Sequence, residues 1–126
     1  MLNKSIKLKI VQSLLEVIKN ISDAEYQHRI WIKALEPLSD FDETMCHFFD
    51  DLNAKEIVEH PQEYGLSLFQ YEKLLELYNA LRIYSDDTPG ILETEVMQDP
   101  RWHKIRTLAK ETLLVFNYPN ANQIVT

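Results

Sequence analysis

The chain has 126 residues, which is enough for one domain around a single buried core. Its two glycines exclude the glycine-rich phosphate-binding loops of Walker and Rossmann type, and its single cysteine excludes an internal disulfide and cysteine-based zinc sites. The net charge of −7 argues against direct nucleic-acid binding and against docking on anionic membranes, but it is compatible with a basic protein partner.

No membrane segment or leader is apparent in the sequence. There is no run of about 20 apolar residues, and Lys7 and Lys9 interrupt the apolar residues near the start. The lone thiol of Cys46 is typical of a reducing compartment. We therefore expect a cytoplasmic protein, and no motif indicates a bound cofactor.

The first part of the chain has a helical pattern from about residue 2 to residue 21. Its apolar stripe and the residues that widen it are Ile6, Ile10, Val11, Leu14, Leu15, Val17, Ile18 and Ile21. Ser22 or Asp23 is expected to cap a second helix that ends near Leu35. Residues 30–33 fit either this helix or a short strand, and both interpretations remain open.

Two more helices are expected in the middle of the chain. One begins near Ser39 or Asp40 and continues or restarts through Ile57, ending before Pro61. Its buried positions follow helical spacing: Phe41, Met45, Phe48 and Leu52. The next begins at Ser67, with Gln70 as its capping-box partner. Its apolar stripe is Leu68, Tyr71, Leu74, Leu75, Tyr78 and Leu81.

Residues 85–90 are typical of a turn or loop. The last helix is expected to begin at Pro100, with Asp99 as its cap, and to end near Phe116. Its inward residues are Trp102, Ile105, Leu108, Ala109, Leu113 and Phe116. The sequence thus predicts an all-α fold, a compact bundle of about five helices, with one domain over residues 1–118 and a C-terminal tail at 119–126.

Charge is unevenly distributed along the chain. Residues 1–35 have a net charge of +3, residues 36–99 of −13, and residues 100–126 of +3. One interpretation is that the basic ends fold against the acidic middle and neutralise it. The other is that the acidic middle is available to a basic partner, which clustered carboxylates attract over a distance.

The helix expected after residue 40 separates its charges from its apolar stripe. A rotation of about 100° per residue places a polar set on the opposite face or its edges: Asp40, Glu43, Cys46, His47, Asp50 and Asp51. Glu43, His47 and Asp50 are suitable ligands for a divalent metal. One helix rarely supplies a whole metal site, however, so a solvated acidic face is the favoured interpretation and no metal is expected.

No catalytic motif accompanies these residues. The histidines available for acid–base chemistry are His28, His47, His60 and His103, and none lies in a zinc-protease motif or beside a candidate nucleophile. Cys46 and His47 are adjacent on a helix, so their side chains point about 100° apart. We therefore predict that the protein is not an enzyme.

Tyrosines in the acidic middle are candidate interface anchors, because aromatic residues often dominate the energetics of interfaces. Tyr71 and Tyr78 are expected in the core. Tyr84 lies beside Asp86 and Asp87 and is the tyrosine best placed for exposure.

The segment of residues 83–92, Ile-Tyr-Ser-Asp-Asp-Thr-Pro-Gly-Ile-Leu, resembles part of the colicin-type nuclease immunity proteins. That family is small, acidic and helical, with a tyrosine-bearing segment followed by acidic residues, a proline, a glycine and two aliphatic residues. The resemblance implies that Tyr84, Asp86 and Asp87 contact a basic toxin nuclease.

Together these patterns predict an immunity or inhibitor protein that neutralises a basic bacterial toxin. The predicted partner-binding residues are Asp40, Glu43, His47, Asp50, Asp51, Tyr84, Asp86 and Asp87. One alternative is a helical adaptor or regulatory subunit, which joint exposure of Trp31 and Trp102 would favour. A further alternative is a metal-binding protein or enzyme built around the possible metal ligands named above.

Overall fold

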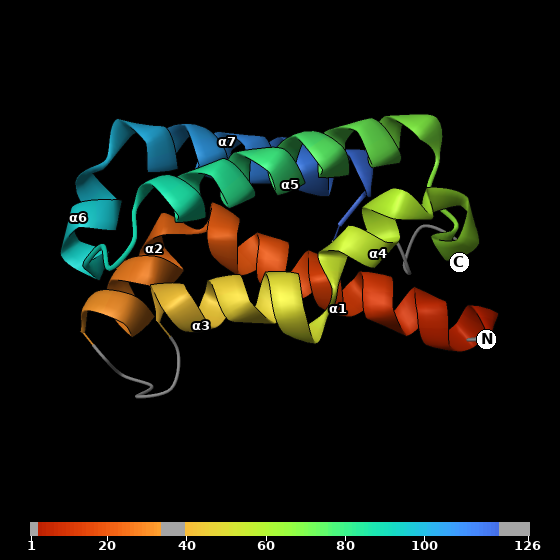
Figure 1. The fold of residues 1–126 in the computed structure, drawn as a ribbon, viewed down its shortest axis with the longest axis horizontal. Coiled ribbons are helices and arrows are strands. Elements are labelled where there is room, and N and C mark those ends of the chain that lie inside the picture. The colour runs from red at the N-terminus through yellow and green to blue at the C-terminus, as the bar shows by residue number, and fades with distance from the viewer. Residues whose placement is uncertain (1–2, 34–39, 119–126) are drawn as a thin grey trace.

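The chain folds into a bundle of helices, described here from a computed structural model for residues 3–33 and 40–118 (Figure 1). Helices α5 (Leu68–Asp87) and α7 (Pro100–Val115) lie side by side in opposite directions, and α1 (Lys4–Ser22) packs against α7. No strand occurs in the described ranges. The predicted all-α fold is therefore confirmed.

Shorter elements complete the bundle. After α1, α2 (Ala24–Gln27) continues as a π-helical turn, η1 (His28–Ile32), so the described part of residues 30–33 is helical rather than extended. Similarly, α3 (Phe41–Cys46) continues as η2 (His47–Asp51). The expected helix end near Leu35, the expected helix start at Ser39 and the tail at 119–126 fall outside the described residues.

The region expected to continue or restart through Ile57 restarts. Asn53 adopts a left-handed backbone conformation with φ of 48°, and α4 (Ala54–Glu59) begins directly after it. A 3-10 turn, η3 (Pro61–Tyr64), follows. The sequence did not predict α6 (Glu93–Gln98), whose start is stabilised because the Glu95 carboxylate accepts a hydrogen bond of 3.1 Å from the Leu92 N–H.

The predicted helix starts are confirmed by their side-chain caps. Asp40 Oδ1 accepts a hydrogen bond of 2.7 Å from the Glu43 N–H, and Ser67 and Gln70 form the reciprocal pair of a capping box. Asp99 Oδ1 accepts from the Arg101 N–H at 2.9 Å, directly before Pro100. Each carboxylate or hydroxyl satisfies a backbone donor that has no partner within its helix.

Four aromatic rings pack together near one end of the bundle. Trp102 is fully buried, and its ring centroid lies 5.9 Å from that of Trp31, 5.4 Å from that of Phe41 and 5.5 Å from that of Tyr84. These residues belong to four different elements. The cluster therefore fixes η1, α3, α5 and α7 relative to one another.

Two details of the predicted apolar stripes are wrong. Leu68 is 68% exposed, and Ile6 is exposed too, because both lie in the first turn of a helix, outside the core. The buried residues of α5 are Leu74, Leu77, Leu81 and Tyr84.

The predicted loop at residues 85–90 begins later than expected, because helix α5 continues through Asp87. The Thr88 hydroxyl donates a hydrogen bond of 2.6 Å to the Tyr84 carbonyl and stabilises the last turn of the helix.

Candidate partner-binding surface

Four exposed carboxylates lie on α3 and η2: Asp42, Glu43, Asp50 and Asp51. We call these four residues the acidic face. Phe41, Met45 and Phe48 on the same segment point into the core, so the amphipathic pattern fixes the orientation of the carboxylates. The predicted exposure of Glu43, Cys46, His47 and Asp50 is confirmed.

All four carboxylates of the acidic face affect the pKa of the Cys46 thiol. Its pKa is raised above the usual value, first by partial desolvation and then by the negative charges of Asp50, Glu43, Asp42 and Asp51. Cys46 is exposed and is the only cysteine of the chain. It is therefore a natural chemical probe of the potential at this surface.

Asp40 and His47 support the acidic face. Besides capping α3 with its carboxylate, Asp40 uses its backbone carbonyl to accept a hydrogen bond of 2.8 Å from the Thr44 hydroxyl. His47 Nδ1 lies 3.0 Å from Asp51 Oδ2, one turn further along. Both residues thus hold the local backbone or a neighbouring carboxylate in place.

The described basic residues at the two ends of the chain form no ion pair with this surface. Within the described residues, two ion pairs join a basic residue of either end to an acidic residue of the middle, Lys7 to Glu63 and Arg101 to Asp99. Neither involves the acidic face. Over residues 3–33 and 40–118, the only ion pair of the face is the one between Asp51 and His47.

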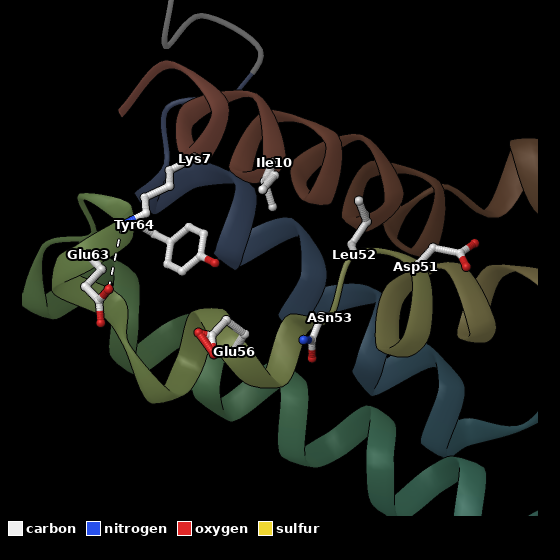
Figure 2. Close-up of a pocket in the computed structure, with 8 residues that line it drawn as sticks. All are labelled: Lys7, Ile10, Asp51, Leu52, Asn53, Glu56, Glu63 and Tyr64. Carbon is white, nitrogen blue, oxygen red and sulfur yellow. Dashed lines mark ion pairs between the residues drawn. The ribbon is translucent and has the colours of Figure 1, made fainter. Parts of the chain in front are cut away.

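A hollow of about 400 Å³ lies beside the acidic face, between α1, α4 and η3 (Figure 2). Lys7 is only 14% exposed; its ammonium group lies 3.6 Å from a Glu63 oxygen and 5.7 Å from the centre of the Tyr64 ring. Burial, followed by the charges of Glu56 and Glu63, raises the pKa of Tyr64. The Tyr64 ring and the Glu63 carboxylate thus already bind the ammonium group of Lys7.

His60 joins the two carboxylates of this hollow. Its Nδ1 lies 3.0 Å from a Glu63 oxygen, and its Nε2 lies 3.8 Å from a Glu56 oxygen. The sequence analysis missed this group, although the separations of four and three residues that join His60 to Glu56 and Glu63 were a readable signal. The ion pair between Glu63 and Lys7 was not readable, because Lys7 is far away in the sequence.

A second hollow, of about 330 Å³, lies between α1, α2 and α3. Glu43, His47 and Asp51 line one part of it, and Val17, Asn20 and Tyr26 line another. Asp51 lines both hollows. The acidic face therefore borders concave surfaces into which side chains of a partner could fit.

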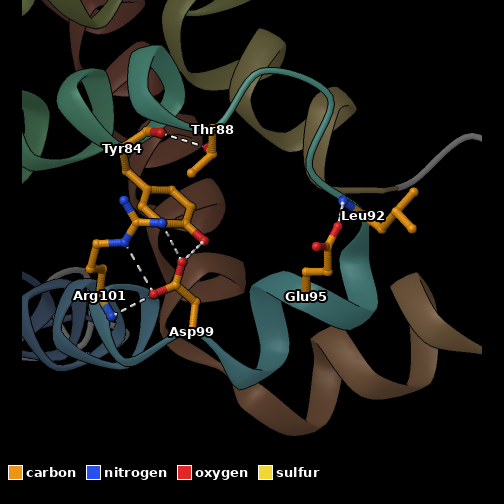
Figure 3. A network of polar contacts seen from close by, with 6 residues as sticks. All are labelled: Tyr84, Thr88, Leu92, Glu95, Asp99 and Arg101. Atoms are coloured by element: carbon orange, nitrogen blue, oxygen red, sulfur yellow. Dashed lines mark hydrogen bonds and ion pairs between the residues drawn. The ribbon is translucent and has the colours of Figure 1, made fainter.

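The predicted exposure of Tyr84 is wrong. Tyr84 is 3% exposed, and its hydroxyl donates a hydrogen bond of 3.0 Å to Asp99 Oδ2 (Figure 3). Burial and then this hydrogen bond raise the pKa of Tyr84 above its usual range. Because α5 is longer than expected, Tyr84 faces α7, and its ring contacts Phe41 at 6.0 Å, behind the first turn of α3.

Asp86 and Asp87 are exposed at the end of α5, as expected. The two residues belong to a different helix from the acidic face, so the predicted site residues form two separate sets along the chain. The buried ring of Tyr84, on the same helix as Asp86 and Asp87, contacts the Phe41 ring at the start of α3.

The described residues contain no group of three or more His, Cys, Asp or Glu side chains arranged to hold a metal ion. His47 pairs with Asp51 rather than with both Glu43 and Asp50. Nor is any helix in residues 3–33 and 40–118 long and apolar enough to cross a membrane.

No protein-family model, curated protein or solved structure matches this chain. The resemblance of residues 83–92 to colicin-type nuclease immunity proteins therefore stays a resemblance. A functional proposal has to rest on the geometry and charge of the surface itself.

The raised pKa of Cys46 gives a first test. Replacing Asp50 with asparagine removes one of the charges that oppose thiolate formation, so the pKa of Cys46 should fall and its alkylation by iodoacetamide at pH 8 should be faster. Glu72→Gln, an equal charge loss at an exposed position of α5, is the control. Equal alkylation rates for Asp50→Asn and the unmodified protein would show that the carboxylates do not act together on Cys46.

Proposed function

We propose that the protein binds a basic protein partner through the acidic face and the two hollows that border it. One observation carries this proposal: four exposed carboxylates surround Cys46, and the described basic residues at the two ends of the chain form no ion pair with them. Such a surface speeds association with a basic partner, by about tenfold to a thousandfold at low salt, and selects against acidic partners.

In its more specific form, the proposal is an immunity or inhibitor protein that neutralises a basic bacterial toxin, with a nuclease as one candidate. A nuclease needs a basic groove for its phosphate-bearing substrate, and an acidic protein can occupy that groove in place of nucleic acid. Small size, excess negative charge and the resemblance of residues 83–92 support this form. Asp86 and Asp87 are its accessible candidates at α5, whereas Tyr84 is buried.

The adaptor alternative receives no support from the tryptophans. Trp31 and Trp102 are both buried in the aromatic cluster, so they offer no joint apolar contact surface. The large exposed apolar side chains are distributed over several elements: Ile6, Leu8, Leu68, Phe69, Ile83, Leu92 and Leu114.

Binding to the product of the neighbouring gene, measured by isothermal titration calorimetry, tests the proposal. We expect a basic partner whose affinity falls steadily as salt rises, because screening weakens attraction between exposed charges. Asp50→Lys should weaken binding at least tenfold, equivalent to about 1.4 kcal/mol. Glu72→Lys, the same charge reversal on α5, should have little effect.

Two outcomes would overturn the proposal. One is binding that does not change with salt, and the other is an equal effect of the two lysine substitutions. A thiol-labelling experiment provides a second readout, because a partner seated on the acidic face should protect Cys46 from alkylation. Full reactivity of Cys46 in a saturated complex would place the contact elsewhere.

A further inference from the structure

A groove of about 260 Å³ lies between the end of α5 and the start of α7, away from the residues assigned to the acidic face. Its apolar lining consists of Ala80, Ile83 and Tyr84 from α5 and Ile105 from α7. Ile83 is 54% exposed, although its neighbour Tyr84 is buried. The surface thus presents a large apolar side chain beside a small one, Ala80, that leaves room for a partner's side chain.

The wall of this groove is held in position before any partner binds. Arg101 lies over the Tyr84 ring at 5.2 Å, and its Nη2 donates to Asp99 Oδ2 at 2.8 Å. The same carboxylate accepts the Tyr84 hydroxyl. The charge of Arg101 is therefore already compensated, and the groove needs no rearrangement of these three residues.

The two remaining charged residues of the groove have opposite signs. Asp87 and Lys104 are both exposed, and neither forms an ion pair within residues 3–33 and 40–118. Arg101 lies beside Tyr84 and is close enough for the charge of Asp87 to raise its pKa, after the larger effect of Asp99. Helices α5 and α7 run in opposite directions (Figure 1), and Arg101 lies over the Tyr84 ring. One turn further along α7, Lys104 therefore pairs with positions further back along α5, towards Ala80. Asp87 and Lys104 thus occupy opposite corners of the groove.

We propose that this groove is the contact surface of a symmetric dimer formed by two copies of the chain. A two-fold axis through the groove brings Asp87 of each copy opposite Lys104 of the other, so that both ion pairs form at once. Ile83 of each copy then lies against the other's groove beside Ala80, removing apolar surface from water. A second copy is the occupant that matches this surface, because the surface carries one unpaired charge of each sign beside the exposed Ile83 and is therefore complementary to itself in charge.

The contact is small, so the dimer is expected to dissociate on dilution rather than to be permanent. It leaves the acidic face free, since Asp42, Glu43, Asp50 and Asp51 do not line this groove. Asp87 is also a candidate contact in the immunity form of the proposed function, so Asp50→Lys, outside the groove, and Lys104→Asp, outside the acidic face, separate the two proposals.

Sedimentation equilibrium of the full chain, from micromolar to millimolar concentrations, tests the dimer. We expect a reversible monomer–dimer equilibrium that Ile83→Glu abolishes. The single variants Asp87→Lys and Lys104→Asp should each weaken association at least tenfold. The double variant Asp87→Lys/Lys104→Asp exchanges the charges and should restore association to within a few-fold of the unmodified protein.

Leu114→Glu is the matched control, because Leu114 is exposed on the same helix α7 but does not line the groove. Circular dichroism spectra should verify that every variant is folded. The proposal is overturned if the unmodified protein stays monomeric throughout, if Ile83→Glu still dimerises, or if the double variant associates no better than the single ones. Equal disruption by Leu114→Glu would overturn it as well.

Discussion

Replacing Trp102 with alanine should lower the free energy of unfolding by about 3–5 kcal/mol. The indole is fully buried and contacts the rings of Trp31, Phe41 and Tyr84. Alanine would leave a cavity where four elements meet, and the loss combines the missing apolar burial with the missing contacts. Domains of this size are usually stable by about 5–15 kcal/mol, so the effect takes a large part of the total.

Trp102→Phe separates packing from hydrogen bonding. Trp102 Nε1 donates a hydrogen bond of 2.9 Å to Gln27 Oε1, and Gln27 is itself fully buried. The Gln27 amide nitrogen donates to the carbonyls of Asn20 and Ile21, at the end of α1. Phenylalanine keeps an aromatic ring but leaves a buried acceptor unsatisfied, which should cost about 1–3 kcal/mol.

Urea unfolding followed by circular dichroism at pH 7 measures both effects. Leu114→Ala is the control on the same helix, because its side chain is exposed and its loss should change stability by about 0.5 kcal/mol or less. A loss below about 1 kcal/mol for Trp102→Ala would mean that the aromatic cluster does not carry the stability assigned to it.

Local signals explain why much of the fold could be predicted. Asp40 before Phe41, Ser67 with Gln70, and Asp99 before Pro100 each satisfy backbone donors within one helical turn, so the sequence alone contains the whole interaction. The exposure of the acidic face was predictable for the same reason. On one helix, buried apolar residues determine which side faces water.

Tyr84 could not be placed in this way. Four exposed or half-exposed polar residues follow it, and its local context is typical of a surface position. Its burial depends on Trp102 and Asp99, which come from the start of α7. The hollow beside the acidic face is similar, because Lys7 reaches Glu63 only once α1 has packed against η3. Contacts between elements, rather than local patterns, decide these positions.

Replacing Asp99 with alanine should lower the free energy of unfolding by about 2–4 kcal/mol, because the variant loses two kinds of interaction. Its carboxylate caps α7 through the Arg101 N–H, and it accepts the buried hydroxyl of Tyr84. The cap contributes about 1 kcal/mol, and an unsatisfied buried hydroxyl costs about 1–3 kcal/mol. The side-chain ion pair with Arg101 adds little, because that guanidinium is largely exposed.

Asp99→Asn removes the charge and one of the two acceptor oxygens, so asparagine can cap α7 or accept the Tyr84 hydroxyl but not both. The lost hydrogen bond does not change between pH 7 and pH 2, whereas the contribution of the charge does. The pKa of Asp99 is lowered from 3.8 to about 2, first by the hydrogen bond from the Arg101 side chain and further by those from the Arg101 backbone and Tyr84. A carboxyl group whose pKa is lower in the folded than in the unfolded state stabilises the fold above the unfolded pKa. That contribution is lost as the pH falls from about 4 towards about 2.

Thermal unfolding of the unmodified protein and of Asp99→Asn is compared at each pH, and the change of their difference with pH tests the charge. The unmodified protein should be the more stable one at pH 7, and the difference between the two should shrink below pH 4. Other carboxyl groups titrate in both proteins and cancel in this comparison. A constant difference down to pH 2 would contradict the lowered pKa. Above pH 10 both proteins should lose stability, because the buried Tyr84 favours the fold only while its hydroxyl keeps its proton. The total loss should be larger in the unmodified protein, since the hydrogen bond to Asp99 and the charge of Asp99 also raise the pKa of Tyr84.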